Sequence, residues 1–81
     1  MVKLSKEVEE YIKSRILPEL KLNEITDENI VDIEQYIWIE KEGPLCDAEE
    51  AGEKLSSEQK EELRLATKAV TEITSDPDWS K

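Results

Sequence analysis

The chain lacks histidine and phenylalanine, and its 81 residues include one cysteine and two glycines. Without histidine, it has no copy of the commonest general base and transition-metal ligand. Cys46 has no second cysteine for an intramolecular disulfide, and the acidic residues beside it oppose formation of a thiolate. Gly43 and Gly52 are too few for a glycine-rich phosphate-binding loop. These absences predict a protein that is not an enzyme and uses no cofactor.

Basic side chains are also scarce, 11 against 21 acidic ones, which gives a net charge of −10 and a pI near 4.4. The excess lies in the middle of the chain, because residues 23–53 hold eleven acidic side chains and one basic one, Lys41. Such a field repels nucleic acids and anionic membranes and attracts cationic proteins. We therefore expect a protein partner or a second copy of the chain, and neither nucleic acid nor a membrane.

Long apolar runs are missing as well, both at the start of the chain and inside it. The first residues lack the apolar segment of a signal peptide, and no uncharged stretch approaches the length of a membrane span. The expected location is cytoplasmic. A length of 81 residues fits one small domain, residues 1–81, with a limited core.

The apolar residues that are present follow helical spacing, first between Ser5 and Leu17. Ser5 is a good N-cap residue, and one face of the predicted helix carries Leu4, Val8, Tyr11, Ile12 and Ile16. Pro18 lacks an amide hydrogen and clashes with the preceding helical turn. The sequence therefore predicts a first helix that ends near Leu17.

A second helix is predicted to start at the N-cap Thr26 and to end at Gly43 and Pro44. Its interior carries one apolar stripe of Ile30, Ile33 and Ile37, with Tyr36 beside it. A second stripe of Val31 and Trp38 predicts two neighbours for this helix. The second neighbour is either another helix of the bundle or a partner protein on an exposed patch. A strand through residues 35–41 is the competing structure, because tyrosine, isoleucine and tryptophan favour strands.

A third helix is predicted from the N-cap Ser56, with Gln59 completing a capping box, as far as the break at Pro77. One face of it carries Leu63, Ala66, Ala69, Val70 and Ile73. The tail, residues 75–81, is expected to fold back over the bundle through Trp79. Residues 3–10 and 54–62 share the pattern Lys-Leu-Ser followed by two glutamates at equal spacing, which shared capping chemistry explains.

The segment between the second and third helices resembles a calcium-binding EF-hand loop in part. Asp47, Gly52 and Glu58 match loop positions 1, 6 and 12 of that pattern. Ala51 and Leu55 offer no side-chain oxygen at positions 5 and 9, so we expect no calcium binding here. The favoured interpretation is a short helical elbow that Asp47 starts and Gly52 ends.

The predicted fold is all-α, a small bundle of three main helices with a short helical elbow between helices two and three. The expected function is a non-enzymatic protein interaction module, which self-associates in one version. Its candidate interaction residues are Val31, Glu34, Gln35, Trp38, Glu42 and Trp79. The alternative is an acidic inhibitor or nucleic-acid mimic that blocks a cationic protein surface. Its candidate carboxylates are Asp27, Glu28, Asp32, Glu34, Glu42, Glu49, Glu50 and Glu53.

Overall fold

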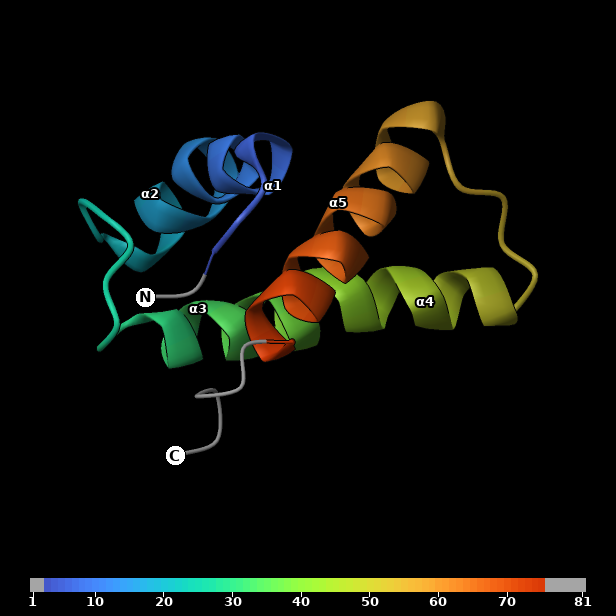
Figure 1. Cartoon of the computed structure of the whole chain (residues 1–81). Helices are drawn as coiled ribbons and strands as arrows, with labels where there is room; N and C mark the ends of the chain where they lie inside the picture. Colours follow the sequence, from blue (N-terminus) through green and yellow to red (C-terminus); the bar gives the residue numbers. More distant parts are fainter. Residues whose placement is uncertain (1–2, 76–81) are drawn as a thin grey trace.

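The computed structural model describes residues 3–75, which form three helical rods and, within that range, no strand (Figure 1). The first rod joins α1 (Lys6–Tyr11), the π-helical segment η1 (Ile12–Ile16) and α2 (Leu17–Leu20). The second joins α3 (Ile30–Tyr36), the π-helical segment η2 (Ile37–Glu42) and α4 (Gly43–Glu50). The third rod is α5 (Ser57–Thr74). The all-α bundle of three main helices is confirmed, and residues 35–41 are helical. The predicted position of Trp79 lies outside the described residues.

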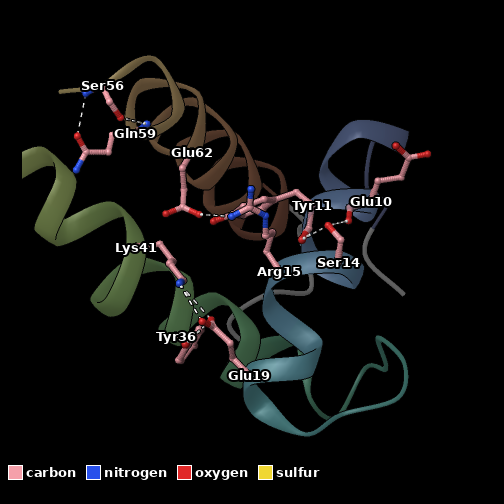
Figure 2. Close-up of polar contacts among 10 residues, drawn as sticks. All are labelled: Glu10, Tyr11, Ser14, Arg15, Glu19, Tyr36, Lys41, Ser56, Gln59 and Glu62. Atoms are coloured by element: carbon pink, nitrogen blue, oxygen red, sulfur yellow. Dashed lines mark hydrogen bonds and ion pairs between the residues drawn. The ribbon is translucent and has the colours of Figure 1, made fainter.

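Side chains cap the first and third rods as the sequence predicts, whereas Thr26 caps a turn that precedes α3, whose own N-cap, Asn29, makes no side-chain cap bond. Ser5 Oγ accepts a hydrogen bond from the amide three residues later, at 3.4 Å. Thr26 and Asn29 bond reciprocally, because each side-chain oxygen accepts the other residue's amide, at 3.1 and 2.8 Å. Ser56 and Gln59 form the same reciprocal pair, drawn in Figure 2. These bonds satisfy amides that have no partner inside a helix.

Pro18 does not end the first helix, contrary to the prediction, because the rod continues to Leu20. In a regular α-helix the proline ring would clash with the carbonyl group four residues earlier. The turn before Pro18 is wider, since the Leu17 amide bonds to the Ile12 carbonyl, five residues back. This π-helical turn accommodates the proline inside a continuous helix.

The first rod ends at Lys21, which adopts the left-handed conformation with φ of 57°. The Lys21 amide donates to the Pro18 carbonyl at 3.2 Å, and the Leu22 amide donates to the Leu17 carbonyl at 2.9 Å. These two bonds form a Schellman motif, whose left-handed position is usually occupied by glycine. Leu22 then packs against the core, which fixes the direction of the chain as it leaves the helix.

Gly43 and Pro44 do not end the second helix either, because the turn before Pro44 is also π-helical. Gly43 is right-handed helical, with φ of −55° and ψ of −57°, and its amide bonds to the Trp38 carbonyl, five residues back. A Cβ atom on Gly43 would lie 3.0 Å from that carbonyl oxygen. The glycine therefore permits a close backbone approach inside the helix instead of a left-handed end.

The second rod ends at Gly52, where φ is 84°. The Gly52 amide donates to the Glu49 carbonyl at 3.1 Å, and the Glu53 amide donates to the Ala48 carbonyl at 3.0 Å. Gly52 is confirmed as a terminator, and the residues of the predicted elbow are helical. They continue the second rod without a break, so Asp47 lies inside α4 and caps no separate helix.

The core lies between α5 and the other two rods, and Figure 1 shows α5 crossing the second rod between α3 and α4 with the first rod beside it. Ser5 donates its amide to Glu72 at 2.7 Å, while Arg15 lies beside Glu62, so the first rod and α5 run antiparallel. The predicted apolar faces are confirmed by the fully buried side chains Val8, Ile12, Ile16, Ile33, Ile37, Ala66, Ala69 and Ile73. Each buried isoleucine contributes about 1.5–3 kcal/mol by removal from water. In contrast, α4 contributes no buried residue.

Candidate functional site

The first candidate site is an exposed patch on the second rod, which we name the apolar patch and define as Val31, Trp38 and Ile39. Their exposed fractions are 45%, 51% and 56%. Val31 lies in α3, and the other two lie in η2. The bundle buries Ile33 and Ile37 from the same rod and leaves the Val31/Trp38 stripe in solvent. Internal packing of that stripe, one of the two interpretations, is therefore wrong.

The remaining predicted interaction residues divide by burial. Gln35 is exposed, between Val31 and Trp38 in sequence. Its side-chain amide donates to Glu34 Oε2 at 2.8 Å, and Glu34 itself is 5% exposed. Glu34 therefore cannot contact a partner directly, although it orients Gln35. Glu42 is half-buried at the end of η2, and Trp79 lies outside the described residues.

Lys41, the one base of residues 23–53, is tied to the first rod (Figure 2). Its Nζ lies 3.1 Å from Glu19 Oε2 and 5.9 Å from the centre of the Tyr36 ring. The Tyr36 hydroxyl donates to Glu19 at 2.6 Å. This hydrogen bond raises the pKa of Tyr36 to about 12, and it lowers the pKa of Glu19 together with Lys41. Asp32 and Glu40, next to the patch in sequence, are exposed with no cation paired to them among residues 3–75.

The second candidate site is a groove of about 460 Å³ between the first rod and α5. We name it the acidic groove, because its walls carry five glutamates and one arginine. Its apolar part comes from Tyr11 and Leu65. The other lining residues are Glu7, Glu10, Ser14, Arg15, Ser57, Glu58, Glu61 and Glu62. A volume of this size lies within the range of about 300–1,000 Å³ that is usual for ligand pockets.

Tyr11 brings a buried hydroxyl group to the acidic groove. Its side chain is 5% exposed, and its hydroxyl is buried with no hydrogen-bond partner within residues 3–75. Burial raises the pKa of Tyr11, and the nearby Glu62 raises it further, so the hydroxyl is protonated at neutral pH. Figure 2 shows Tyr11 together with Arg15 and Glu62 between the two rods. A buried hydroxyl without a partner is costly, which marks this position as unusual.

Two arginines pair with glutamates of the groove, Arg64 at short distance and Arg15 at a longer one. Arg64 binds Glu7 at 2.6 Å and also binds Glu61, whose pKa it lowers. Arg15 Nη1 lies 3.7 Å from Glu62 Oε2, beyond hydrogen-bond distance, and its side chain is 68% exposed. Glu7 and Glu61 therefore have a close hydrogen-bonded partner, whereas Arg15 lies farther from Glu62.

Sequence reasoning missed the acidic groove, although one signal for it was visible. The similar segments 3–10 and 54–62 place Glu7 opposite Glu58 and Glu10 opposite Glu61 in their alignment. All four glutamates line the groove, which brings the two helix starts to one site. Shared capping chemistry explains the serines of this pattern, and the positive helix ends favour Glu7 and Glu58 in the first turns, but neither explains Glu10 and Glu61.

The partial calcium-loop pattern does not form a loop in the structure. Asp47 and Glu49 lie in α4, and Ser56 caps α5 before Glu58. Among residues 3–75, no group of three metal-binding side chains gathers at one place. Cys46 is half-buried, and burial together with Glu42 raises the pKa of its thiol.

Comparison with known proteins places this chain in no family, because no family model, curated protein or solved structure matches it. The helices of the described part of the chain are too short or too polar to cross a membrane.

Proposed function

We propose that the chain is a non-enzymatic interaction module that binds a partner protein through the apolar patch. The observation that carries this proposal is the exposure of Val31, Trp38 and Ile39, at 45–56%, beside isoleucines of the same rod that are fully buried. An exposed tryptophan with two exposed aliphatic side chains on the same rod supports a surface that another protein covers. Tryptophan is also among the residues that contribute most to protein interfaces.

The charges near the patch indicate the chemistry of the partner. Asp32 and Glu40 flank the patch in sequence, and Lys41 is engaged with Glu19. We therefore propose a partner surface with an apolar centre and a basic rim. Self-association is the other version, and the repulsion between two acidic rims works against it at low salt.

We also propose a cytoplasmic location, and it and the non-enzymatic role have separate support. The chain has no histidine, and its cysteine is held in the thiol form by a raised pKa. Its single cysteine is consistent with a reducing compartment.

Affinity capture from the native cell tests the proposal with Trp38→Ala against the wild type. Loss of a buried interface tryptophan costs about 2 kcal/mol or more, so a specific partner should be lost or reduced by roughly thirtyfold. Thr67→Ala, an exposed change on α5, is the matched control and should retain the partner. Capture of the same proteins by the Trp38→Ala variant, with its fold intact by circular dichroism, would contradict the role of the patch. Sedimentation velocity separates the self-associating version, which predicts a dimer that Trp38→Ala dissociates.

A second candidate function, an acidic mimic that blocks a cationic protein surface, has one observation in its favour. The α4 segment buries no residue and carries Asp47, Glu49 and Glu50, with Glu53 just after it. The burial of Glu34 removes one of its predicted carboxylates. Binding through charge alone would weaken steeply as salt rises and would be lost in a triple Glu49→Gln, Glu50→Gln, Glu53→Gln variant. Binding through the apolar patch would survive both changes.

A further inference from the structure

We propose that the acidic groove is a second binding site, which receives an arginine side chain from a basic peptide segment of a partner. The arginine stem would lie against Tyr11 and Leu65, and its guanidinium would bind Glu62. This site lies between the first rod and α5, whereas the apolar patch lies on the second rod. The inference therefore goes beyond the proposed function and does not depend on it.

The charges of the groove select a cation. Five glutamates and one arginine line it, and Arg64 holds two of the glutamates, Glu7 and Glu61. Glu10 and Glu58 have no ion-pair partner within residues 3–75, and Glu62 has one at 3.7 Å. Carboxylates recognise a guanidinium better than an ammonium, because its planar group donates two parallel hydrogen bonds. An arginine is therefore the side chain that matches the available carboxylates.

The Tyr11 hydroxyl supplies an observation independent of these charges. It is buried at the groove without a hydrogen-bond partner within the described residues. The hydroxyl is protonated, and its oxygen can accept a hydrogen bond from a guanidinium. A ligand that enters here would supply the missing partner.

Arg15 occupies this position in the ligand-free protein. Its guanidinium lies at 3.7 Å from Glu62, its side chain is 68% exposed, and Figure 2 shows it beside Tyr11. An exposed ion pair of this length contributes little, so an incoming arginine can replace it at small cost. Arg15 would then act as an internal competitor of the ligand.

A peptide titration followed by NMR of the ¹⁵N-labelled chain tests the proposal. The probe is a short blocked helical peptide with one arginine and one leucine a turn apart, and its control carries citrulline in place of arginine. The arginine peptide should shift the amides of residues 10–15 and 57–65, and the uncharged citrulline should weaken binding by about tenfold. Equal binding of both peptides, or shifts centred on the apolar patch, would overturn the proposal. Tighter binding of free butylguanidinium than of the peptide would also overturn it, because the peptide would then not be the ligand.

Four variants make the test specific. Glu62→Gln and Tyr11→Phe should each weaken the arginine peptide by about threefold or more. Arg15→Gln should tighten it by about threefold, because it removes the competitor. Lys13→Gln makes the same charge change outside the groove, where Lys13 pairs with Glu9, and should alter binding by less than about 1.5-fold. Equal effects of Arg15→Gln and Lys13→Gln on peptide affinity would show that net charge alone controls binding, and this result would overturn the proposal.

Two further readouts separate binding from folding. Tyr11→Phe should not lower the thermal midpoint of the free chain, since it removes a hydroxyl that has no partner. A lower midpoint would assign Tyr11 a structural hydrogen bond and overturn its role in the groove. Trp38→Ala should leave peptide binding unchanged, so failure of the groove and failure of the apolar patch are distinguishable.

Discussion

The first and second rods both continue past a proline and both end at a left-handed residue, but the residues at these positions differ. Each contains a proline two residues after a π-helical segment, and each ends in a Schellman motif. In the first rod the residue before the proline is Leu17, which is buried, and the left-handed end is Lys21. In the second rod the corresponding residues are Gly43 and Gly52. The first rod therefore depends on packing at its proline, whereas the second depends on close backbone contact.

Another difference is the length of helix beyond the proline. The first rod ends at Leu20, two residues after Pro18, and Leu22 returns to the core. The second rod continues to Glu50, and Glu53 after its end is exposed. A proline in a long helix thus does not determine where that helix ends when the preceding turn is π-helical. The C-cap residues determine it instead.

Among the substitutions that test the difference between the two rods, Leu17→Ala should give the largest loss of stability. Leu17 is 3% exposed, and truncation of a buried leucine costs about 2–5 kcal/mol through lost burial and the cavity left behind. Urea unfolding followed by circular dichroism measures the change. A loss of less than about 1 kcal/mol would contradict the dependence of the first rod on packing.

Gly43→Ala should destabilise the chain by about 1 kcal/mol, although alanine normally stabilises the interior of a helix. The new Cβ would meet the Trp38 carbonyl oxygen at 3.0 Å, and a backbone atom cannot move aside as a side chain can. The same denaturation experiment measures the change. A gain in stability would show that the π-helical turn relaxes without cost.

Substitutions at the two left-handed helix ends should change the stability of the chain in opposite directions. Gly52→Ala should cost about 1 kcal/mol, because alanine is strained at a φ of 84° even though no atom beyond its chain neighbours would lie within 4 Å of the new Cβ. Lys21→Gly should stabilise by roughly 0.5 kcal/mol, because it removes the same strain from the first rod. Paired unfolding curves test both changes. A loss of stability in Lys21→Gly would mean that the lysine side chain contributes more than its backbone strain costs.

The pH dependence of the Glu19–Tyr36–Lys41 link between the two rods should give the smallest effect. Folding lowers the pKa of Glu19, so its stabilisation is present above the unfolded pKa and is lost as pH falls through the lower folded value. Folding raises the pKa of Tyr36 to about 12, so that contribution is present below the unfolded pKa and is lost as pH rises towards 12. Glu19→Gln should reduce both slopes of stability against pH, whereas the exposed Glu53→Gln should leave them unchanged. Identical pH profiles for wild type and Glu19→Gln would contradict the link.

The helix starts and the core could be predicted from sequence because they depend on local chemistry. Ser5, Thr26 and Ser56 bond to amides three residues away, and the buried isoleucines repeat at helical spacing. The ends of the first two helices could not be predicted in the same way. A proline indicates a break only if the turn before it is α-helical, and the register of that turn depends on the packing around it.

The two candidate sites also differ in how far the sequence could predict them. The second apolar stripe was visible in sequence, but its exposure depends on where α5 and the first rod lie. The acidic groove required two segments about fifty residues apart to meet. Sequence periodicity identifies the faces of a helix, but it cannot say which faces are covered.

The absence of buried residues in α4 has a consequence for the dynamics of the molecule. Opening of residues 43–50 breaks helical hydrogen bonds but removes none of the segment's own side chains from a buried position, so it requires less free energy than global unfolding. Hydrogen exchange should therefore be fast at the amides of residues 47–50 and slow at those of Ile33 and Ile37. The half-buried thiol of Cys46 would become accessible in the same local opening, and its rate of alkylation would report how often this part of the helix melts.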